Sequence, residues 1–204
     1  MKKILLLIFT VSILSCKSQG KRIVLGESDF QKEMNAKFKD ASRSPLTKKG
    51  LKEFNGLDFF PIDEKYKVNA SLELLPDAPI FNFPTTTDRV VLYKKYGVLS
   101  FSVEGEDFEL AIYQDVKPDP EYANHLFLPF LDNTNGKTSY KGGRFIDVYT
   151  TDIKDDDTIV IDFNKAYNPY CAYSDRYSCP ITPSDNYLDI EIKAGVMAYE
   201  KPSK

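Results

Sequence analysis

Two acidic residues and one arginine in the second half of the chain have the types and spacing for acid–base chemistry or for holding an anion. Asp132 and Asp162 each follow an apolar run, and Arg144 lies between them, directly after Gly142-Gly143. A guanidinium binds a carboxylate through two parallel hydrogen bonds, and glycines let the backbone approach a neighbour closely. We therefore expect Arg144 to be buried and paired with a carboxylate of a ligand, or with Asp132 or Asp162 inside the fold.

Polar and aromatic residues around these three supply further candidates. An irregular loop follows Asp162, because Asn168 precedes a proline and is biased away from the helical region. Ordered loops of this kind carry function more often than strands do. The candidate ligand-binding residues are Asp132, Tyr140, Arg144, Asp162, Asn164, Tyr167 and Asn168. An aromatic wall for stacking on a sugar or another flat ligand, or a pack of rings over a sheet edge, is predicted for Tyr167, Tyr170, Tyr173 and Tyr177.

Cys171 and Cys179 form an even pair in the C-terminal part of the chain, and a disulfide between them would close a short loop. The alternatives are inert thiols, a reactive thiol pair, or a zinc site. Zinc would need more ligands than the chain offers nearby, since His125 is the single histidine. The acidic run at residues 155–157 is typical of a solvated turn. We expect no metal and no cofactor.

The familiar catalytic signatures are absent. The chain contains no Gly-x-Ser-x-Gly, no His-Glu-x-x-His and no phosphate-binding glycine loop. This favours a domain that binds a small molecule, a glycan or a protein partner. One alternative is a hydrolase-type enzyme with Asp132 and Asp162 as acid and base and Arg144 holding charge. The other is a structural envelope protein, which would have no concave pocket near Arg144.

The N-terminus predicts a location. Lys2 and Lys3 precede an apolar run at residues 4–14, and Ile13-Leu14-Ser15-Cys16 resembles the lipobox of bacterial lipoproteins. We expect residues 1–15 to be a signal peptide, Cys16 to carry the lipid, and residues 16–27 to be a tether. The protein would then sit in the bacterial cell envelope, anchored in the bilayer through acyl chains on Cys16 and facing the periplasm from the outer membrane. The alternative is an ordinary secretory signal.

Composition limits the partners and the fold class. The net charge is −3, which makes nucleic acid a poor candidate partner because that binding needs clustered Lys and Arg. The chain has no Trp but carries 13 Tyr and 14 Phe, a supply that favours strands.

The periodicity predicts helices first and strands afterwards. Ser28 and Gln31 have capping-box spacing ahead of an apolar stripe at Phe30, Met34 and Phe38, which indicates a docked helix. A second short helix is expected from Ser44-Pro45 to Gly56. Alternation then predicts a strand over 66–74, and a hairpin is expected from strands over 99–103 and 108–112. Further strands are predicted over 88–93, 125–130, 144–150, 158–163 and 187–192. Residues 28–204 are therefore predicted to form one all-β domain, an antiparallel sandwich or barrel with one or two N-terminal helices.

The polar block of the second half also carries a family resemblance. Its runs are Asp132-Asn133-Thr134-Asn135-Gly136, Tyr140-Lys141-Gly142-Gly143-Arg144-Phe145, Asn168-Pro169-Tyr170-Cys171-Ala172-Tyr173 and Tyr177-Ser178-Cys179-Pro180. In these runs the chain resembles the bacterial domain of unknown function 1684 family. The resemblance implies an all-β domain in secreted or lipid-anchored proteins and supplies no activity. The family pattern ends with Ala-Gly-Glu, whereas here Ala194-Gly195 is followed by Val196.

Overall fold

The computed structural model describes residues 28–201. The expected signal peptide, the lipidated Cys16 and the tether lie outside the described residues. Within the described part, no helix has the length and apolar character needed to cross a membrane.

Two helices open the described chain. Helix α1 (Asp29–Lys39) begins with the predicted capping box, in which Ser28 and Gln31 exchange side-chain-to-backbone hydrogen bonds. Helix α2 (Lys48–Glu53) starts later than expected, because Thr47 rather than Ser44 caps it by accepting from the N–H of Gly50. Phe38 of the predicted α1 stripe is fully buried.

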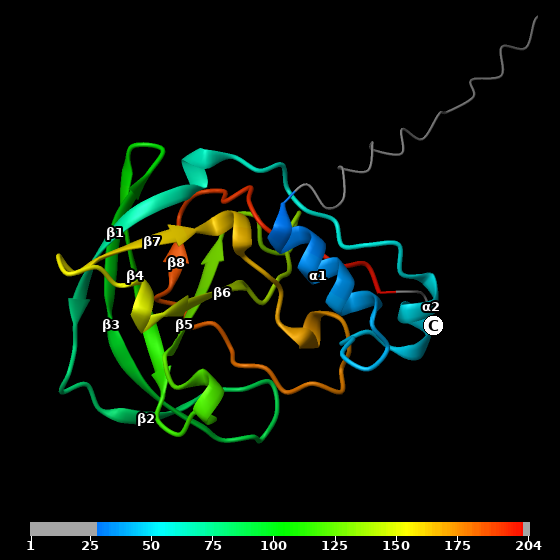
Figure 1. The fold of residues 1–204 in the computed structure, drawn as a ribbon, viewed down its shortest axis with the longest axis horizontal. Helices are drawn as coiled ribbons and strands as arrows, with labels where there is room; N and C mark the ends of the chain where they lie inside the picture. Colours follow the sequence, from blue (N-terminus) through cyan, green and yellow to red (C-terminus); the bar gives the residue numbers. More distant parts are fainter. Residues whose placement is uncertain (1–27, 202–204) are drawn as a thin grey trace, which may run out of the picture.

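The rest of the chain forms one curled, eight-stranded sheet, which resembles half of a barrel (Figure 1). Along the sheet the order is β6-β5-β4-β3-β1-β7, while β2 pairs with β3 and β8 with β5. All pairs are antiparallel except β5 with β8. The strands are β1 (Lys67–Leu74), β2 (Ile80–Phe83), β3 (Val91–Val103), β4 (Glu106–Asp115), β5 (His125–Asp132), β6 (Arg144–Tyr149), β7 (Thr158–Asp162) and β8 (Tyr187–Leu188). The connections contain 3-10 turns η1 (Glu64–Tyr66), η2 (Pro120–Tyr122), η3 (Thr150–Asp152), η4 (Phe163–Lys165) and η5 (Tyr170–Ala172).

The all-β prediction is confirmed, with local differences. Strand β2 was not expected, and it is a short edge strand whose Ile80 is 60% exposed. Strand β3 begins at Val91 rather than at Asp88, and it joins the two segments predicted over 88–93 and 99–103 into one long strand. Strand β8 has only two residues, because the chain beyond Leu188 leaves the sheet.

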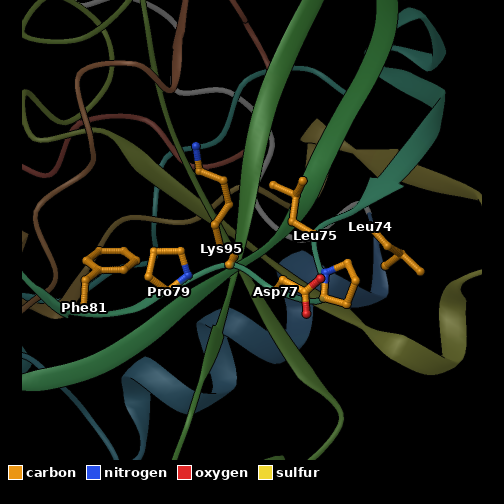
Figure 2. A pocket seen from close by; sticks show the side chains of 8 residues that line it. Leu74, Leu75, Asp77, Pro79, Phe81 and Lys95 are labelled. Atoms are coloured by element: carbon orange, nitrogen blue, oxygen red, sulfur yellow. The ribbon is translucent and has the colours of Figure 1, made fainter.

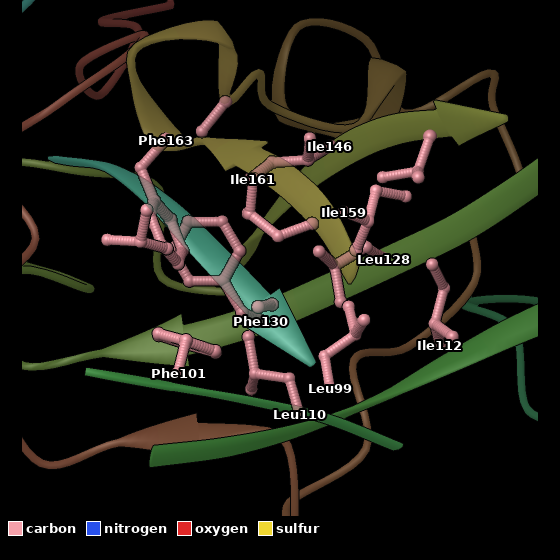
Figure 3. Close-up of a cluster of buried hydrophobic side chains, with 14 of the residues drawn as sticks. Leu99, Phe101, Leu110, Ile112, Leu128, Phe130, Ile146, Ile159, Ile161 and Phe163 are labelled. Atoms are coloured by element: carbon pink, nitrogen blue, oxygen red, sulfur yellow. The ribbon is translucent and has the colours of Figure 1, made fainter. Parts of the chain in front are cut away.

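The concave side of the sheet holds the main core. Alternate residues of each strand point inward, as in β1, where Val68, Ala70 and Leu72 are buried and their neighbours are exposed. Figure 3 shows inward side chains of several strands meeting, among them Leu99, Leu110, Phe130 and Ile161.

Two further clusters cover the other side of the fold. Alternation places Phe127 of β5 and Phe145 of β6 on the face opposite the main core, where they pack with Phe83 and Tyr113. The helices pack through Phe38 onto Tyr173, with ring centroids 4.7 Å apart. The loop after β7 therefore contacts α1 through Tyr173 and pairs beside β6 through the backbone of Tyr167.

Candidate functional site

Arg144 is the most completely enclosed charge in the described chain, and its partner is Asp132. Its Nη2 donates to Asp132 Oδ2 across 2.5 Å, and neither side chain has any exposed surface. The expected internal pair is therefore present, with Asp132 rather than Asp162 as the partner. Burial lowers the pKa of Arg144, and the adjacent carboxylate opposes that shift.

Arg144 also ties the C-terminal segment to the sheet. Its guanidinium donates to the carbonyl oxygens of Ile192, at 2.8 Å, and Ala194. The rings of Phe60 and Phe130 lie over it, with centroids 5.8 and 5.1 Å from Cζ. This environment leaves no surface through which a substrate could reach Arg144 or Asp132.

Gly143 makes this placement possible. Its φ is +87°, and a Cβ there would lie 2.7 Å from the carbonyl oxygen of Phe130 and 2.6 Å from Thr182 Oγ1. The backbone before Arg144 therefore approaches the neighbouring strand as the glycine pair predicted.

The remaining predicted site residues occupy separate places. Asp162 accepts hydrogen bonds from the backbone and side-chain amides of Asn164. The side chain of Asn164 in turn accepts from the backbone N–H of Asp63 and donates to its carbonyl oxygen. Buried Asn168 donates to the carbonyl oxygen of Met197 at 2.8 Å. Each of these groups closes a local turn or fixes the C-terminal segment. They do not converge on Arg144, so they form no single acid–base site.

Tyr140 lies beside the cysteine pair. Its hydroxyl is 3.8 Å from Cys171 Sγ, and the backbone N–H of Cys171 donates to Cys179 Sγ at 3.1 Å. Both cysteines are free thiols in the structure, so the expected disulfide is not formed there. A hydrogen bond from the Cys179 thiol lowers the pKa of Cys171 to about 6, and the same contact raises the pKa of Cys179.

An aromatic cleft lies on the outer face of β6 and has a volume of about 410 Å³. We call it the tyrosine cleft. Helix α1, the start of β5, strand β6 and the loop after β7 all contribute to its walls. Its aromatic lining consists of Phe30, Tyr122, His125, Phe145, Tyr149, Tyr167, Tyr170 and Tyr177, and the other lining residues are Met34, Lys37, Asp147, Pro169, Ser178, Cys179 and Pro180.

Three polar side chains of the tyrosine cleft form one hydrogen-bonded group. Asp147 Oδ1 lies 2.8 Å from His125 Nε2 and accepts from the Tyr167 hydroxyl at 2.6 Å. Burial, and then the Asp147 charge, raise the pKa of Tyr167 well above its usual value. Asp147 Oδ2 makes no hydrogen bond to the described residues, and the Asp147 side chain is 44% exposed.

Strand register explains how this group forms. His125 of β5 pairs with Tyr149 of β6, and Phe127 pairs with Asp147, so His125 and Asp147 are diagonal neighbours on one face. Tyr167 reaches the same place because its backbone N–H and C=O bond to those of Phe145, both at 2.9 Å. The loop after β7 therefore acts as a short extra strand beside β6.

The predicted aromatic wall is present in part. Tyr167, Tyr170 and Tyr177 line the cleft, and the last two have ring centroids 5.2 Å apart. Tyr173 instead belongs to the core beneath α1, where it is 1% exposed. Asp147 and Tyr149 were not among the residues singled out from the sequence, where His125 was considered as a possible zinc ligand. Alternation along β6 places Asp147 and Tyr149 on the solvent side.

Two other clefts lie away from the tyrosine cleft. One, of about 580 Å³, lies at the turn between β1 and β2 and is lined mainly by leucine, proline and Phe81, together with Lys95 and Asp77 (Figure 2). The other, of about 650 Å³, is a polar hollow on the β1–β3–β4 surface, near Asn69 and Glu109. Arg144 lines none of the three clefts. Within residues 28–201, no three His, Cys, Asp or Glu side chains are placed to hold a metal ion.

Comparison with known proteins identifies relatives but no activity. The family model described as "Protein of unknown function (DUF1684)" matches residues 52–197. The solution NMR structure of an uncharacterised protein from gene locus rrnAC0354 of Haloarcula marismortui is similar, with 35% identity and a TM-score of 0.65. That match covers 81% of this chain and 89% of the other. No curated protein matches the chain.

Proposed function

This chain belongs to the DUF1684 family of proteins of unknown function, and we propose that it is an envelope lipoprotein whose β domain binds a small ligand in the tyrosine cleft. The family assignment agrees with the resemblance in the polar block. Family membership supports the fold but names no activity, so the function depends on the chemistry of the site.

One observation carries the proposal: an aromatic cleft converges on a carboxylate with an unused oxygen. Ligand sites are concave, mostly apolar and contain a few positioned polar groups, with volumes of about 300–1,000 Å³. The tyrosine cleft has about 410 Å³, and Asp147, His125 and Tyr167 meet in it. Their mutual hydrogen bonds fix them before a ligand arrives, which lowers the entropy cost of binding.

A fragment library screened by NMR tests this proposal. We expect several flat or polar-ringed fragments to shift resonances of His125, Tyr149 and Tyr170 in a saturable way. The variant Tyr149→Ala should lose these shifts, whereas Tyr187→Ala removes a comparably exposed tyrosine outside the cleft (45% against 40% exposed) and should not. A library with no fragment bound at the cleft would remove the proposal and favour the structural envelope role.

The hydrolase alternative has less support. Asp132 and Arg144 have no exposed surface, and Asp162 is engaged by Asn164. An acid and a base must reach the reacting atoms, and the Asp132–Arg144 pair has no such access.

The anchoring part of the proposal rests on the N-terminal sequence. Residues 1–15 would be removed and Cys16 would carry the acyl chains, placing the domain in the periplasm on the outer membrane. Fractionation without detergent should find the wild type with membranes and the Cys16→Ala variant in the soluble fraction. Equal membrane association of the two proteins would exclude the lipid anchor.

In that oxidising compartment, we also propose that Cys171 and Cys179 are joined. The contact between Cys171 N–H and Cys179 Sγ supports this pairing, because it holds the second sulfur against the first residue's backbone.

A further inference from the structure

We propose that the ligand of the tyrosine cleft is a neutral carbohydrate, with one pyranose ring stacked on Tyr149 and two of its hydroxyls donating to Asp147. This inference rests on the proposed function of the cleft and names the chemical class that fits it.

The stacking surface is exposed and fixed in orientation. Tyr149 is 40% exposed and Tyr122 is 50% exposed, although both are large aromatic side chains. The His125 ring lies between them, with centroids 6.3 Å from Tyr122 and 5.7 Å from Tyr149, at steep interplanar angles. A tyrosine held edge-on by its neighbour keeps a face free, and the apolar C–H face of a sugar ring packs on such a surface.

The polar contact lies next to that face. Asp147 and Tyr149 are two residues apart on β6 and share its outer side, which puts their Cα atoms roughly 7 Å apart. One sugar ring on Tyr149 therefore presents its hydroxyls to Asp147. Oδ1 already accepts from Tyr167 and contacts His125, whereas Oδ2 makes no hydrogen bond to the described residues.

The charges in the cleft argue against other ligand classes. The Asp147 carboxylate, held in place by the hydroxyl of Tyr167, would repel an anionic ligand. The ammonium group of Lys37 would repel a cationic ligand. Its Nζ lies 5.1 Å from the Tyr170 ring centroid, so this ring face is already occupied by a cation. A purely apolar ligand would cover the Asp147 carboxylate without giving it donors, which is costly. A neutral ring with many hydroxyls satisfies Asp147 and the tyrosines together.

NMR titration with named probes tests the inference. The probes are three neutral disaccharides (cellobiose, maltose and N,N′-diacetylchitobiose), choline as a cation and indole as a flat apolar ring. We expect at least one disaccharide to give saturable shifts at His125, Asp147 and Tyr149. Asp147→Asn should weaken its binding by about tenfold or more, since it removes charged hydrogen bonds. Tyr149→Ala should weaken it by about three- to tenfold, whereas Tyr149→Phe keeps the ring and should bind nearly as well.

The outcomes separate this inference from the proposed function. Saturable binding of choline or indole at the cleft, with no disaccharide bound there, would overturn the carbohydrate assignment and leave the ligand site standing. Disaccharide shifts that survive both Asp147→Asn and Tyr149→Ala would place the sugar elsewhere and also overturn it. If no probe and no library fragment shifts the cleft, both proposals fail.

Discussion

Asp132 accepts a hydrogen bond from Arg144 at 2.5 Å in a position where neither side chain is exposed. The pair joins the end of β5 to the start of β6, and Arg144 extends the connection to the carbonyl oxygens of Ile192 and Ala194. The sequence features that suggested a functional site thus build the junction that holds the C-terminal segment against the sheet. The tyrosine cleft lies on the opposite face of β6.

Removing one partner of this pair should destabilise the protein strongly. Arg144→Ala leaves Asp132 buried without its counter-charge, and breaking a buried pair costs about 3–5 kcal/mol. Urea denaturation should show a large drop in the midpoint. The control Lys193→Ala removes an exposed ion pair with Glu191 and should leave the midpoint unchanged. A wild-type midpoint for Arg144→Ala would contradict a structural role.

Asn186 should be a second point of high sensitivity. Strands β4 and β5 pair directly only at Tyr113 and Phe127, and Asn186 bridges the gap beside them. Its side chain accepts from the N–H of Ala111 at 2.9 Å and donates to the oxygens of Ala111 and Pro129, both at 2.7 Å. Pro129 has no N–H for a ladder bond, so a side-chain amide takes over there.

Asn186→Ala should therefore lower the free energy of unfolding by several kcal/mol, since each buried group left unpaired costs about 1–3 kcal/mol. Hydrogen exchange should quicken at the Ala111 amide in particular. Asn69→Ala, an exposed asparagine in β1, is the matched control and should behave like the wild type. An unchanged Ala111 exchange rate in Asn186→Ala would show that the bridge carries no stability.

Alanine substitutions at Gly143 and Gly105 distinguish the cost of an unfavourable backbone conformation from the cost of a steric clash. Both have positive φ, +87° and +86°, but a Cβ on Gly143 would meet backbone and side-chain atoms within 3.0 Å, whereas Gly105 faces open space. Gly105→Ala should cost only the conformational strain, about 1–2 kcal/mol. Gly143→Ala should cost clearly more in the same urea titration. Equal losses would mean that the strand contact at Gly143 relaxes freely.

The sequence predicted those features that depend on neighbouring residues along the chain. The capping box of α1 and the alternation of β1 are local patterns, and the structure confirms them. Strands β5, β6 and β7 also lie over the predicted segments. Strand β2 was missed because Pro76 and Pro79 precede it and its edge position gives weak alternation. The sequence pattern suggested a ligand site at Asp162 and Asn164. In the structure the Asp162 side chain instead caps η4 by accepting from the N–H of Asn164.

The site itself depends on register, which the sequence does not encode locally. Asp147 meets His125 only because β5 and β6 pair with His125 opposite Tyr149. Tyr167 joins them through a bridge to Phe145 from a loop far along the chain. Residue types alone therefore pointed to Arg144, which is buried, as the candidate site residue, and not to Asp147, which is partly exposed.

The raised pKa values of two tyrosines on the outer face of the sheet predict that the protein loses stability at alkaline pH. Burial raises the pKa of Tyr93 and of Tyr113 from 10.0 to about 12. The unfolded chain therefore loses these protons first as the pH rises, and the contribution present below pH 10 is lost as the pH passes through about 12. Urea midpoints should drop across this interval. Tyr113→Phe, which cannot ionise, should show a smaller drop, and an identical drop would contradict the raised pKa.

The cysteine pair gives a prediction for each redox state. In the reduced protein, the hydrogen bond from Cys179, followed by that from Tyr140, favours the thiolate of Cys171 and lowers its pKa to about 6. Iodoacetamide should therefore modify Cys171 with a half-maximal rate near pH 6. Cys179→Ala should move that midpoint upward, toward the ordinary value of 9.0.

With oxidised glutathione, the Cys171 thiolate should attack the glutathione disulfide and release one reduced glutathione. The Cys179 thiolate then displaces the second glutathione, so that one disulfide forms within the chain as another is reduced. Mass mapping should find the peptides of Cys171 and Cys179 joined. The closed loop should raise the urea midpoint over that of the reduced protein, by about 2–3 kcal/mol in free energy. Two alkylatable thiols after this treatment would show that the contact between Cys171 and Cys179 does not lead to a bond.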